Sequence, residues 1–346
     1  MRALFPRLAI GFAAALLAAA PAAAASADAV WKAPRNAFGQ PDLEGVWTNA
    51  SLTSLERGPQ FKTLTIPEAQ AQQVEAMRAR MMAAQNRPSD PNAGAPAAGE
   101  DPGGYNSFWV DPGTRMGRIA GEVRTSWLVE PADGKLPYRP EGWKRYQDTL
   151  MKARNTFDGP EARPLGERCI LGFGSTAGPP MMNVLYNNHY QIQQTVDAVV
   201  IVVEMNHDAR IIRLTDTRRL PKDHPEWMGK STGRWEGDTL VVETTGFNPG
   251  ESLRPYFGAS LYLSPDAKVT ERFTRISKDQ ILYRFEVDDP AVYKSVWKAE
   301  MPLNASKGPV YEYACHEGNY SLPGILAGAR KAEAEGRKPE SVELSE

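Results

Sequence analysis

The sequence predicts a mainly β protein: an antiparallel meander that closes into a lipocalin-like barrel, with a few peripheral helices and long loops. Segments rich in Val, Ile, Tyr and Thr recur about every 10 to 20 residues after Asn183, as in successive short strands. No helical periods separate them, which disfavours parallel βαβ units. Gly and Pro number 29 and 28 among 346 residues, which is typical of a chain with many turns.

The expected strands follow one another closely, and closing such a meander into a barrel removes its exposed edges. Gly45–Trp47 resembles the Gly-x-Trp that opens lipocalin-like barrels and is expected to supply the closing strand. Trp235–Asp238 and Ser277–Asp279 are good turn sequences. We predict the other strands at 190–195, 198–205, 209–214, 239–245, 269–276, 281–287, 295–302 and 310–315.

Helices are expected around the barrel rather than within it. Thr65–Glu68 is a capping-box pattern with Pro67 inside the first turn, and it predicts a helix that ends near Gln85. Pro, Gly, Ala and Asp dominate the next segment, which favours a flexible surface loop. The remaining expectations are this loop at 86–104, helices at 140–155 and 322–334, and a charged tail at 336–346.

Residues 1–25 have the organisation of a secretory signal peptide. Arg2 and Arg7 precede the uncharged apolar run 8–20, and small alanines follow at 22–25. Cleavage after Ala25 would leave 26–346 as a single β-rich domain, and we expect a bacterial periplasmic location. No later segment approaches the roughly 18 uninterrupted apolar residues of a membrane span, so no transmembrane helix is expected in the mature chain.

The balance of charges and the cysteine content limit the classes of partner and the cellular compartment that we expect for this protein. The chain has 40 basic and 42 acidic residues, which argues against nucleic acid because a phosphate-binding surface needs a cationic excess. Cys169 and Cys315 are expected to form a disulfide in an oxidising compartment. The alternatives are two buried free thiols or a reactive or metal-bound thiol. No CxxC motif occurs, which disfavours a zinc knuckle or a thioredoxin-type site.

Two stretches that contain histidine carry the candidate acid–base chemistry. Glu204–Arg210 follows a fully apolar strand, and Cys315–Tyr320 lies at the end of another predicted strand. An imidazole can exchange a proton near pH 7, a carboxylate can orient it, and a guanidinium can stabilise an oxyanion. The alternatives are a simple turn at His207–Asp208 and a structural pair between Asp208 and Arg210. The candidate catalytic residues are His207, His316, Asp208, Arg210 and Glu317.

A second set of side chains is suited to binding a small aromatic or apolar molecule. Aromatic residues at the end of the flexible loop could cover a pocket, although they could equally anchor the loop. Asn187–Asn188 could bind a polar group or form a turn. The candidate binding residues are Tyr105, Asn106, Trp109, Asn187, Asn188, Glu204 and Tyr320. His189 and His224 rank lower, and the absence of nucleotide and metal motifs leads us to expect no cofactor and no metal.

Four stretches together resemble a large, mostly uncharacterised group of exported proteins from sphingomonads and related soil bacteria. They are 163–169 with the following Gly-Pro-Pro and Tyr-Asn-Asn, 204–210, 233–240 and 311–320, within a resemblance that covers residues 40–335. Hosts of this group often degrade plant aromatics. By analogy, the resemblance implies an activity such as that of phenylcoumaran γ-formaldehyde lyase, which opens a lignin-derived dimer and releases formaldehyde.

The leading hypothesis is therefore a periplasmic, cofactor-independent lyase that uses acid–base chemistry on a small lignin-derived aromatic. His207 or His316 would act as base, Arg210 would stabilise a phenoxide, and Asp208 or Glu317 would orient the imidazole. One alternative is a non-catalytic, lipocalin-type binding protein for an apolar small molecule, and another is a structural or interaction protein of the envelope. The sequence leaves the exact substrate, the stereochemistry and the oligomeric state open.

Overall fold

The structure is a computed structural model that describes residues 31–86, 92, 94, 110–171, 178–205, 208–215, 224–250 and 253–339. The chain divides into two compact units, Met1–Trp31 and Lys32–Glu346, and every element below belongs to the second unit. The predicted signal peptide at 1–25 lies outside the described residues. The same is true of most of the predicted loop at 86–104 and most of the tail at 336–346.

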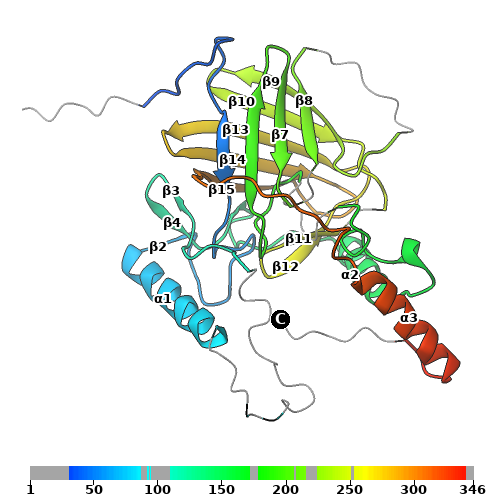
Figure 1. Ribbon diagram of the computed structural model, residues 1–346. Helices are drawn as coiled ribbons and strands as arrows, with labels where there is room; N and C mark the ends of the chain where they lie inside the picture. The colour runs from blue at the N-terminus through cyan, green and yellow to red at the C-terminus, as the bar shows by residue number, and fades with distance from the viewer. Residues whose placement is uncertain are drawn as a thin grey trace, which may run out of the picture. The chain divides into compact units, whose positions relative to one another are not determined.

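Among the described residues, nine strands close into a barrel, which confirms the predicted fold class (Figure 1). Their order is β1-β6-β7-β8-β9-β10-β13-β14-β15, and β15 pairs again with β1. Their bounds are β1 Gly45–Thr48, β6 His189–Gln194, β7 Ala198–Val203, β8 Ala209–Arg213, β9 Lys230–Glu236, β10 Thr239–Thr245, β13 Lys268–Ser277, β14 Gln280–Asp288 and β15 Trp297–Ala305.

The closing strand is the early Gly-x-Trp segment, as the sequence predicts. Trp47 on β1 lies opposite Ala305 on β15 and opposite Tyr190 on β6, and both pairings are antiparallel. One neighbour pair departs from the expected meander, because β8 and β9 run parallel where Arg213 faces Thr232. Parallel neighbours need a long connection, and the chain between β8 and β9 is long enough to return to the same end of the barrel.

The barrel interior is a packed core. On β7, residues alternate between half-buried and fully buried positions, and Val199, Ile201 and Val203 point inward. Large aromatic side chains from other strands fill the rest of the space. The ring centroids of Phe273 and Tyr283, for example, lie 4.9 Å apart, and both side chains are fully buried. Burial of this apolar surface is the main force that holds the strands together.

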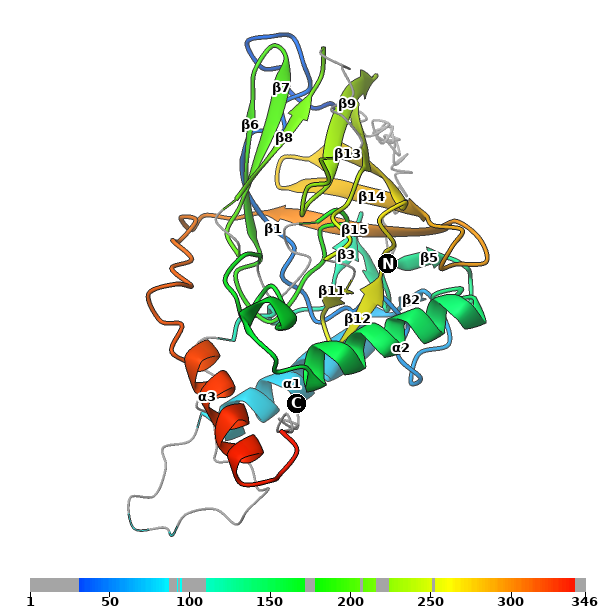
Figure 2. The ribbon, with the colours of Figure 1, turned by 90° about the vertical axis from the view of Figure 1, so that its right-hand side faces the viewer.

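Smaller elements surround the barrel. They are β2 Thr65–Ile66, β3 Arg118–Ile119, β4 Glu122–Arg124, β5 Leu128–Glu130, β11 Leu253–Tyr256, β12 Ala259–Tyr262, α1 Glu68–Gln85, α2 Pro140–Asn155, α3 Ser321–Ala334 and the short 3-10 helix Pro160–Ala162. Helix α2 runs alongside β11 and β12 (Figure 2). A Cβ at Gly142 would come within 2.1 Å of the Val292 carbonyl oxygen, so only glycine permits this close packing of α2.

Other parts of the sequence prediction also differ from the structure. The predicted strand at 310–315 is wrong, because this segment has no regular structure and passes the barrel without joining the sheet. Strand β9 was not predicted, because its sequence KSTGRWE has few of the apolar residues that typify strands. Thr65 belongs to β2, and α1 begins after Pro67 without a side-chain cap. None of the described helices combines the length and apolar character needed to cross a bilayer.

Candidate functional site

A histidine and a glutamate face each other at one end of the β6–β7 hairpin. The antiparallel register pairs Tyr190 with Val203, so the next position places His189 beside Glu204. The backbone N–H of Glu204 donates to the His189 carbonyl over 3.1 Å. The side chains meet as well, with His189 Nδ1 and Glu204 Oε2 3.0 Å apart. The carboxylate is 2% exposed and the imidazole 24%, so the pair lies at the boundary between the core and solvent.

The two groups change each other's protonation. The hydrogen bond to Glu204 raises the pKa of His189 above its ordinary value of 6.5, against the opposing effect of burial, and the negative charge of Asp111 adds to the rise. Burial by itself would raise the pKa of Glu204. The hydrogen bonds from the His189 side chain and the Tyr311 backbone outweigh burial and lower that pKa. The result is a carboxylate paired with an imidazole that favours its protonated form.

This arrangement leaves one ring nitrogen for chemistry. His189 Nδ1 is engaged with Glu204, and no hydrogen bond between described residues involves His189 Nε2. A carboxylate on one nitrogen fixes the ring orientation, while the other nitrogen can transfer a proton to a bound molecule. The pair therefore has the parts of a general acid held in place by a buried carboxylate.

Tyrosines occur in two segments that adjoin the pair in sequence or through Tyr311, and a third segment is joined to one of them. Tyr186 and Tyr313 are half-buried and pack against the core, and the phenol of Tyr186 affects that of Tyr313. Burial raises the pKa of both phenols, that of Tyr313 to about 12, so they stay protonated at neutral pH. The backbone N–H of Asp111 donates to the Leu185 carbonyl over 2.8 Å, which brings the 110–111 segment to the same loop.

The predicted Asn187 and Asn188 differ in their roles. Asn188 is buried, and its side chain accepts from Val184 N–H at 2.9 Å and donates to the carbonyls of Val184 and Asp111. It therefore holds together the loop that precedes β6. Asn187 is half-buried and has a left-handed backbone with φ of 55°, which asparagine tolerates better than most residues.

Arg210, predicted to stabilise a phenoxide, lies inside the barrel. Its guanidinium forms a bidentate ion pair with Glu271, with contacts of 2.6 and 3.1 Å. Both side chains are at most 1% exposed. The Tyr283 hydroxyl donates to the same carboxylate over 2.7 Å. Burial would lower the pKa of Arg210, but Glu271 outweighs it and raises that pKa, so the guanidinium stays charged. The site role of Arg210 stays a prediction.

The other predicted catalytic residues are not gathered around Arg210 or His189 by any contact in the described part of the chain. Asp208 is exposed, and its carboxylate accepts from the Ala209 N–H over 2.8 Å. His316 and Glu317 are exposed in the turn after Cys315, and the predicted binding residue Tyr320 is 83% exposed. The remaining predicted residues His207, Tyr105, Asn106 and Trp109 lie outside the described residues.

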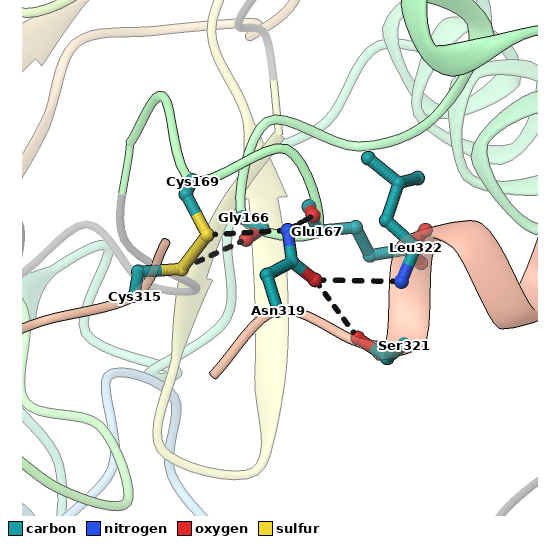
Figure 3. The surroundings of a disulfide bond; sticks show 7 residues. All are labelled: Gly166, Glu167, Cys169, Cys315, Asn319, Ser321 and Leu322. Carbon is teal, nitrogen blue, oxygen red and sulfur yellow. Dashed lines mark hydrogen bonds between the residues drawn. A yellow bond between two sulfur atoms is a disulfide. The ribbon is translucent and has the colours of Figure 1, made fainter. Parts of the chain in front are cut away.

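The predicted disulfide between Cys169 and Cys315 is present (Figure 3). It joins the loop after residue 163 to the segment before α3, and its Cα atoms lie 5.6 Å apart. Asn319 donates to the carbonyl of Glu167 over 2.8 Å and contacts Cys169 Sγ at 3.3 Å beside it. The alternatives of free or metal-bound thiols are thereby excluded.

A groove of about 610 Å³ lies on the outer surface, between the β3–β4 turn and strands β13 to β15. Four of its charged side chains pair with one another, namely Glu122, Arg124, Arg284 and Glu300. Arg124 contacts Glu300 at 2.7 Å, and Arg284 contacts the same carboxylate at 3.2 Å. Neutralised charges and the lack of a titratable histidine make this groove a weaker candidate for catalysis than the His189 pair.

His189 and Glu271 were not among the predicted site residues. The sequence did contain a signal for His189, because the predicted strands 190–195 and 198–205 have only a short turn between them. In an antiparallel hairpin the residue before one strand then faces Glu204 on the other. Nothing comparable exists for Glu271, because β8 and β13 are not neighbours in the sheet and their contact crosses the barrel interior.

Comparison of the chain with family models, curated proteins and solved structures finds no match. The resemblance to exported sphingomonad proteins, and the activity it implies, therefore stay predictions. Within the described residues, no three side chains of His, Cys, Asp or Glu gather as ligands of a metal ion.

Proposed function

We propose that this protein is an acid–base enzyme whose proton donor is His189, oriented by Glu204. The observation that carries the proposal is the 3.0 Å contact between a half-buried imidazole and a buried carboxylate. The same contact raises the pKa of His189, which keeps a transferable proton on the ring near neutral pH. General acid catalysis of this kind contributes typically about 10²- to 10⁴-fold in rate.

For the substrate we propose a small lignin-derived aromatic, following the resemblance, and for the reaction a lyase step. A base removes the proton of a hydroxymethyl group, and the carbon–carbon bond to that group breaks to release formaldehyde. Its electron pair forms a new double bond, the neighbouring carbon–oxygen bond breaks, and the departing phenoxide takes a proton from His189. The half-buried Tyr186 and Tyr313 offer aromatic surface for such a ring. His207 and His316 stay the candidates for the base.

The test compares variants on a panel of lignin-derived dimers, with released formaldehyde and the ring-opened product measured together. His189→Gln is expected to lower kcat/KM by at least about 100-fold, because it removes the proton donor. His224→Gln, at an exposed position that is not part of the pair, is the matched control and should keep full activity. A His189→Gln enzyme as fast as the wild type would overturn the proposal, whereas losses in His207→Ala or His316→Ala would identify the base.

A second candidate is a binding protein for an apolar small molecule, which the closed barrel favours. Against it stand the fully buried aromatic side chains that fill the described interior. Thermal-shift screening followed by recovery of the ligand separates the two functions. A ligand that stabilises the protein and is recovered unchanged favours binding, whereas conversion favours the enzyme. Export to the periplasm is part of both proposals, and the Cys169–Cys315 disulfide is compatible with an oxidising compartment.

A further inference from the structure

The segment between β15 and Cys315 passes the end of β7 where Glu204 lies (Figure 1). We name residues 307–314 the strap. The strap has no helix or strand of its own. Among the described residues, it makes one hydrogen bond to the barrel, from the Tyr311 backbone N–H to Glu204 Oε1 over 3.0 Å. His189 contacts the other oxygen, Oε2, so the strap and the imidazole bond to different oxygens of one carboxylate.

The strap is fixed at both ends. Before it, the backbone N–H of Ser306 donates to the Val46 carbonyl over 2.8 Å, which continues the pairing of β15 with β1. After it, Cys315 is bonded to Cys169 (Figure 3). The loop that carries Cys169 is itself held by Arg163, whose guanidinium pairs with Glu167 at 2.8 and 2.9 Å and is 4% exposed.

One hydrogen bond is too little to order eight residues. Fixing each residue of a chain lowers its conformational entropy, and the strap has neither a helix nor a sheet ladder to offset that loss. The Tyr311 side chain is 67% exposed, so its ring adds little packing, and the half-buried Tyr313 is the aromatic of the strap that packs against the core. The covalent link at Cys315 restricts the strap before any hydrogen bond forms, and this restriction favours the bond from Tyr311 to Glu204.

We propose that Tyr311 and the Cys169–Cys315 disulfide are positioning residues for the His189–Glu204 pair. The disulfide holds the strap where the Tyr311 N–H fixes the carboxylate of Glu204 in its orientation toward His189. The proposal deepens the proposed function, and it rests on that function only for its effect on activity. Among the described residues, the charged groups that act on the imidazole are Glu204 and Asp111, and the carboxylate also lies near the phenol of Tyr190.

The loss of the strap bond has a defined electrostatic consequence. Without the Tyr311 N–H, the carboxylate loses a donor that favours its ionised form and its present orientation. A carboxylate that is less ionised and less well aimed stabilises the imidazolium less. The pKa of His189 should therefore fall toward its ordinary value of 6.5.

Proline at position 311 tests the hydrogen bond without touching the disulfide. Tyr311→Pro removes the N–H, Tyr311→Phe keeps it, and Glu312→Pro controls for the stiffness of proline in the strap. The imidazole signals of the folded full-length protein are titrated by NMR, and His189→Gln identifies the His189 signal among the 4 histidines. We expect a lower His189 pKa in Tyr311→Pro and an unchanged one in both controls. An unchanged titration in Tyr311→Pro overturns the proposal.

Reduction tests the disulfide. A dithiol such as dithiothreitol donates two electrons and two protons, so that Cys169 and Cys315 become thiols while the dithiol closes to a cyclic disulfide. Cys169→Ser with Cys315→Ser gives the same state without reductant. Circular dichroism checks that the barrel stays folded, and the His189 pKa should fall in both preparations. A folded, reduced protein with the wild-type His189 titration would refute the role of the disulfide, and if reduction unfolds the barrel, the Tyr311→Pro comparison decides.

Activity separates this inference from the proposed function. If both hold, the pH–rate profile of Tyr311→Pro shifts to lower pH in step with the His189 pKa, and Tyr311→Phe keeps the wild-type profile. If His189→Gln is fully active but the strap variants still move the His189 pKa, the proposed function fails and the positioning role stands. If the pKa does not move while His189→Gln is inactive, the reverse is true.

Discussion

Two pairs of a carboxylate and a cation include residues that are close in sequence, Glu204 and Arg210, yet the pairs differ in burial and in chemistry. Arg210 and Glu271 meet inside the barrel, where each is at most 1% exposed. His189 and Glu204 meet at the end of the β6–β7 hairpin, where the imidazole keeps 24% of its surface. The inner pair joins a guanidinium, which does not lose its proton near neutral pH, to a carboxylate that also accepts from Tyr283.

The difference shows how burial and cation type decide what a charge pair can do. The inner pair keeps one protonation state and joins β8 to β13, which are not neighbours in the sheet, so we expect it to act on stability. The outer pair contains the one side chain type that titrates near neutral pH, and it lies where a molecule can approach. We therefore expect proton transfer at the His189–Glu204 pair and a contribution to stability from the Arg210–Glu271 pair inside the barrel.

Breaking the inner pair should have the largest effect. Glu271→Gln leaves the guanidinium of Arg210 buried without its counter-charge, and we expect a loss of about 3–5 kcal/mol in the free energy of unfolding. Urea unfolding followed by tryptophan fluorescence measures it. The double variant Arg210→Met with Glu271→Leu removes both charges and should lose less than the single variant. A single variant as stable as the wild type would contradict a structural role.

The hydroxyl of Tyr283 should contribute less to the free energy of unfolding than the charge of Glu271. It donates to Glu271 over 2.7 Å and accepts from the Met181 backbone N–H over 3.0 Å. Tyr283→Phe leaves that N–H and one carboxylate oxygen with one partner fewer in the core, which should lower the free energy of unfolding by about 1–3 kcal/mol. Phe285→Leu, which removes no polar contact, is a packing control for the same urea experiment. No measurable change in Tyr283→Phe would mean that water replaces the hydroxyl.

The His189–Glu204 pair should make the free energy of unfolding depend on pH. The raised pKa of His189 stabilises the folded state fully below the ordinary value of 6.5, and this contribution is lost as pH rises through the folded-state pKa. The lowered pKa of Glu204 stabilises the folded state above 4.5, and this is lost as pH falls through its folded-state value. The stability difference between wild type and His189→Gln should thus be largest between pH 4.5 and 6.5. A difference that does not vary with pH would show that the pair is uncoupled.

An ion pair on the outer surface should have the smallest effect. Arg234 contacts Glu236 at 2.8 Å and Glu243 at 3.1 Å, but its side chain is 52% exposed. Water and salt screen such contacts, so Arg234→Met should change the free energy of unfolding by less than about 1 kcal/mol. The same urea experiment measures it beside Glu271→Gln. A loss as large as that of the inner pair would show that burial does not separate the two classes.

Part of the site follows from the sequence, and the rest does not for physical reasons. Glu204 was predicted because it follows an unusually apolar strand, and the disulfide because two cysteines accompany a signal-like N-terminus. Residue patterns alone rank His189 low, because its importance depends on how strands β6 and β7 align. The strap was interpreted as a strand because 310–315 contains Val and Tyr, although its backbone bonds to a side chain instead of a sheet.

The sequence by itself determined the barrel, its closing strand and the helix at 140–155, because local residue patterns encode strand and helix propensity. Only the tertiary structure decided that Arg210 faces Glu271 inside the barrel and that Tyr311 reaches Glu204. These contacts join residues 61 and 107 positions apart, and neither composition nor periodicity records which side chains meet once the sheet has closed. Closure of the barrel brings these residues into contact. It thereby decides which charged groups are buried in the core and which lie where they can exchange a proton.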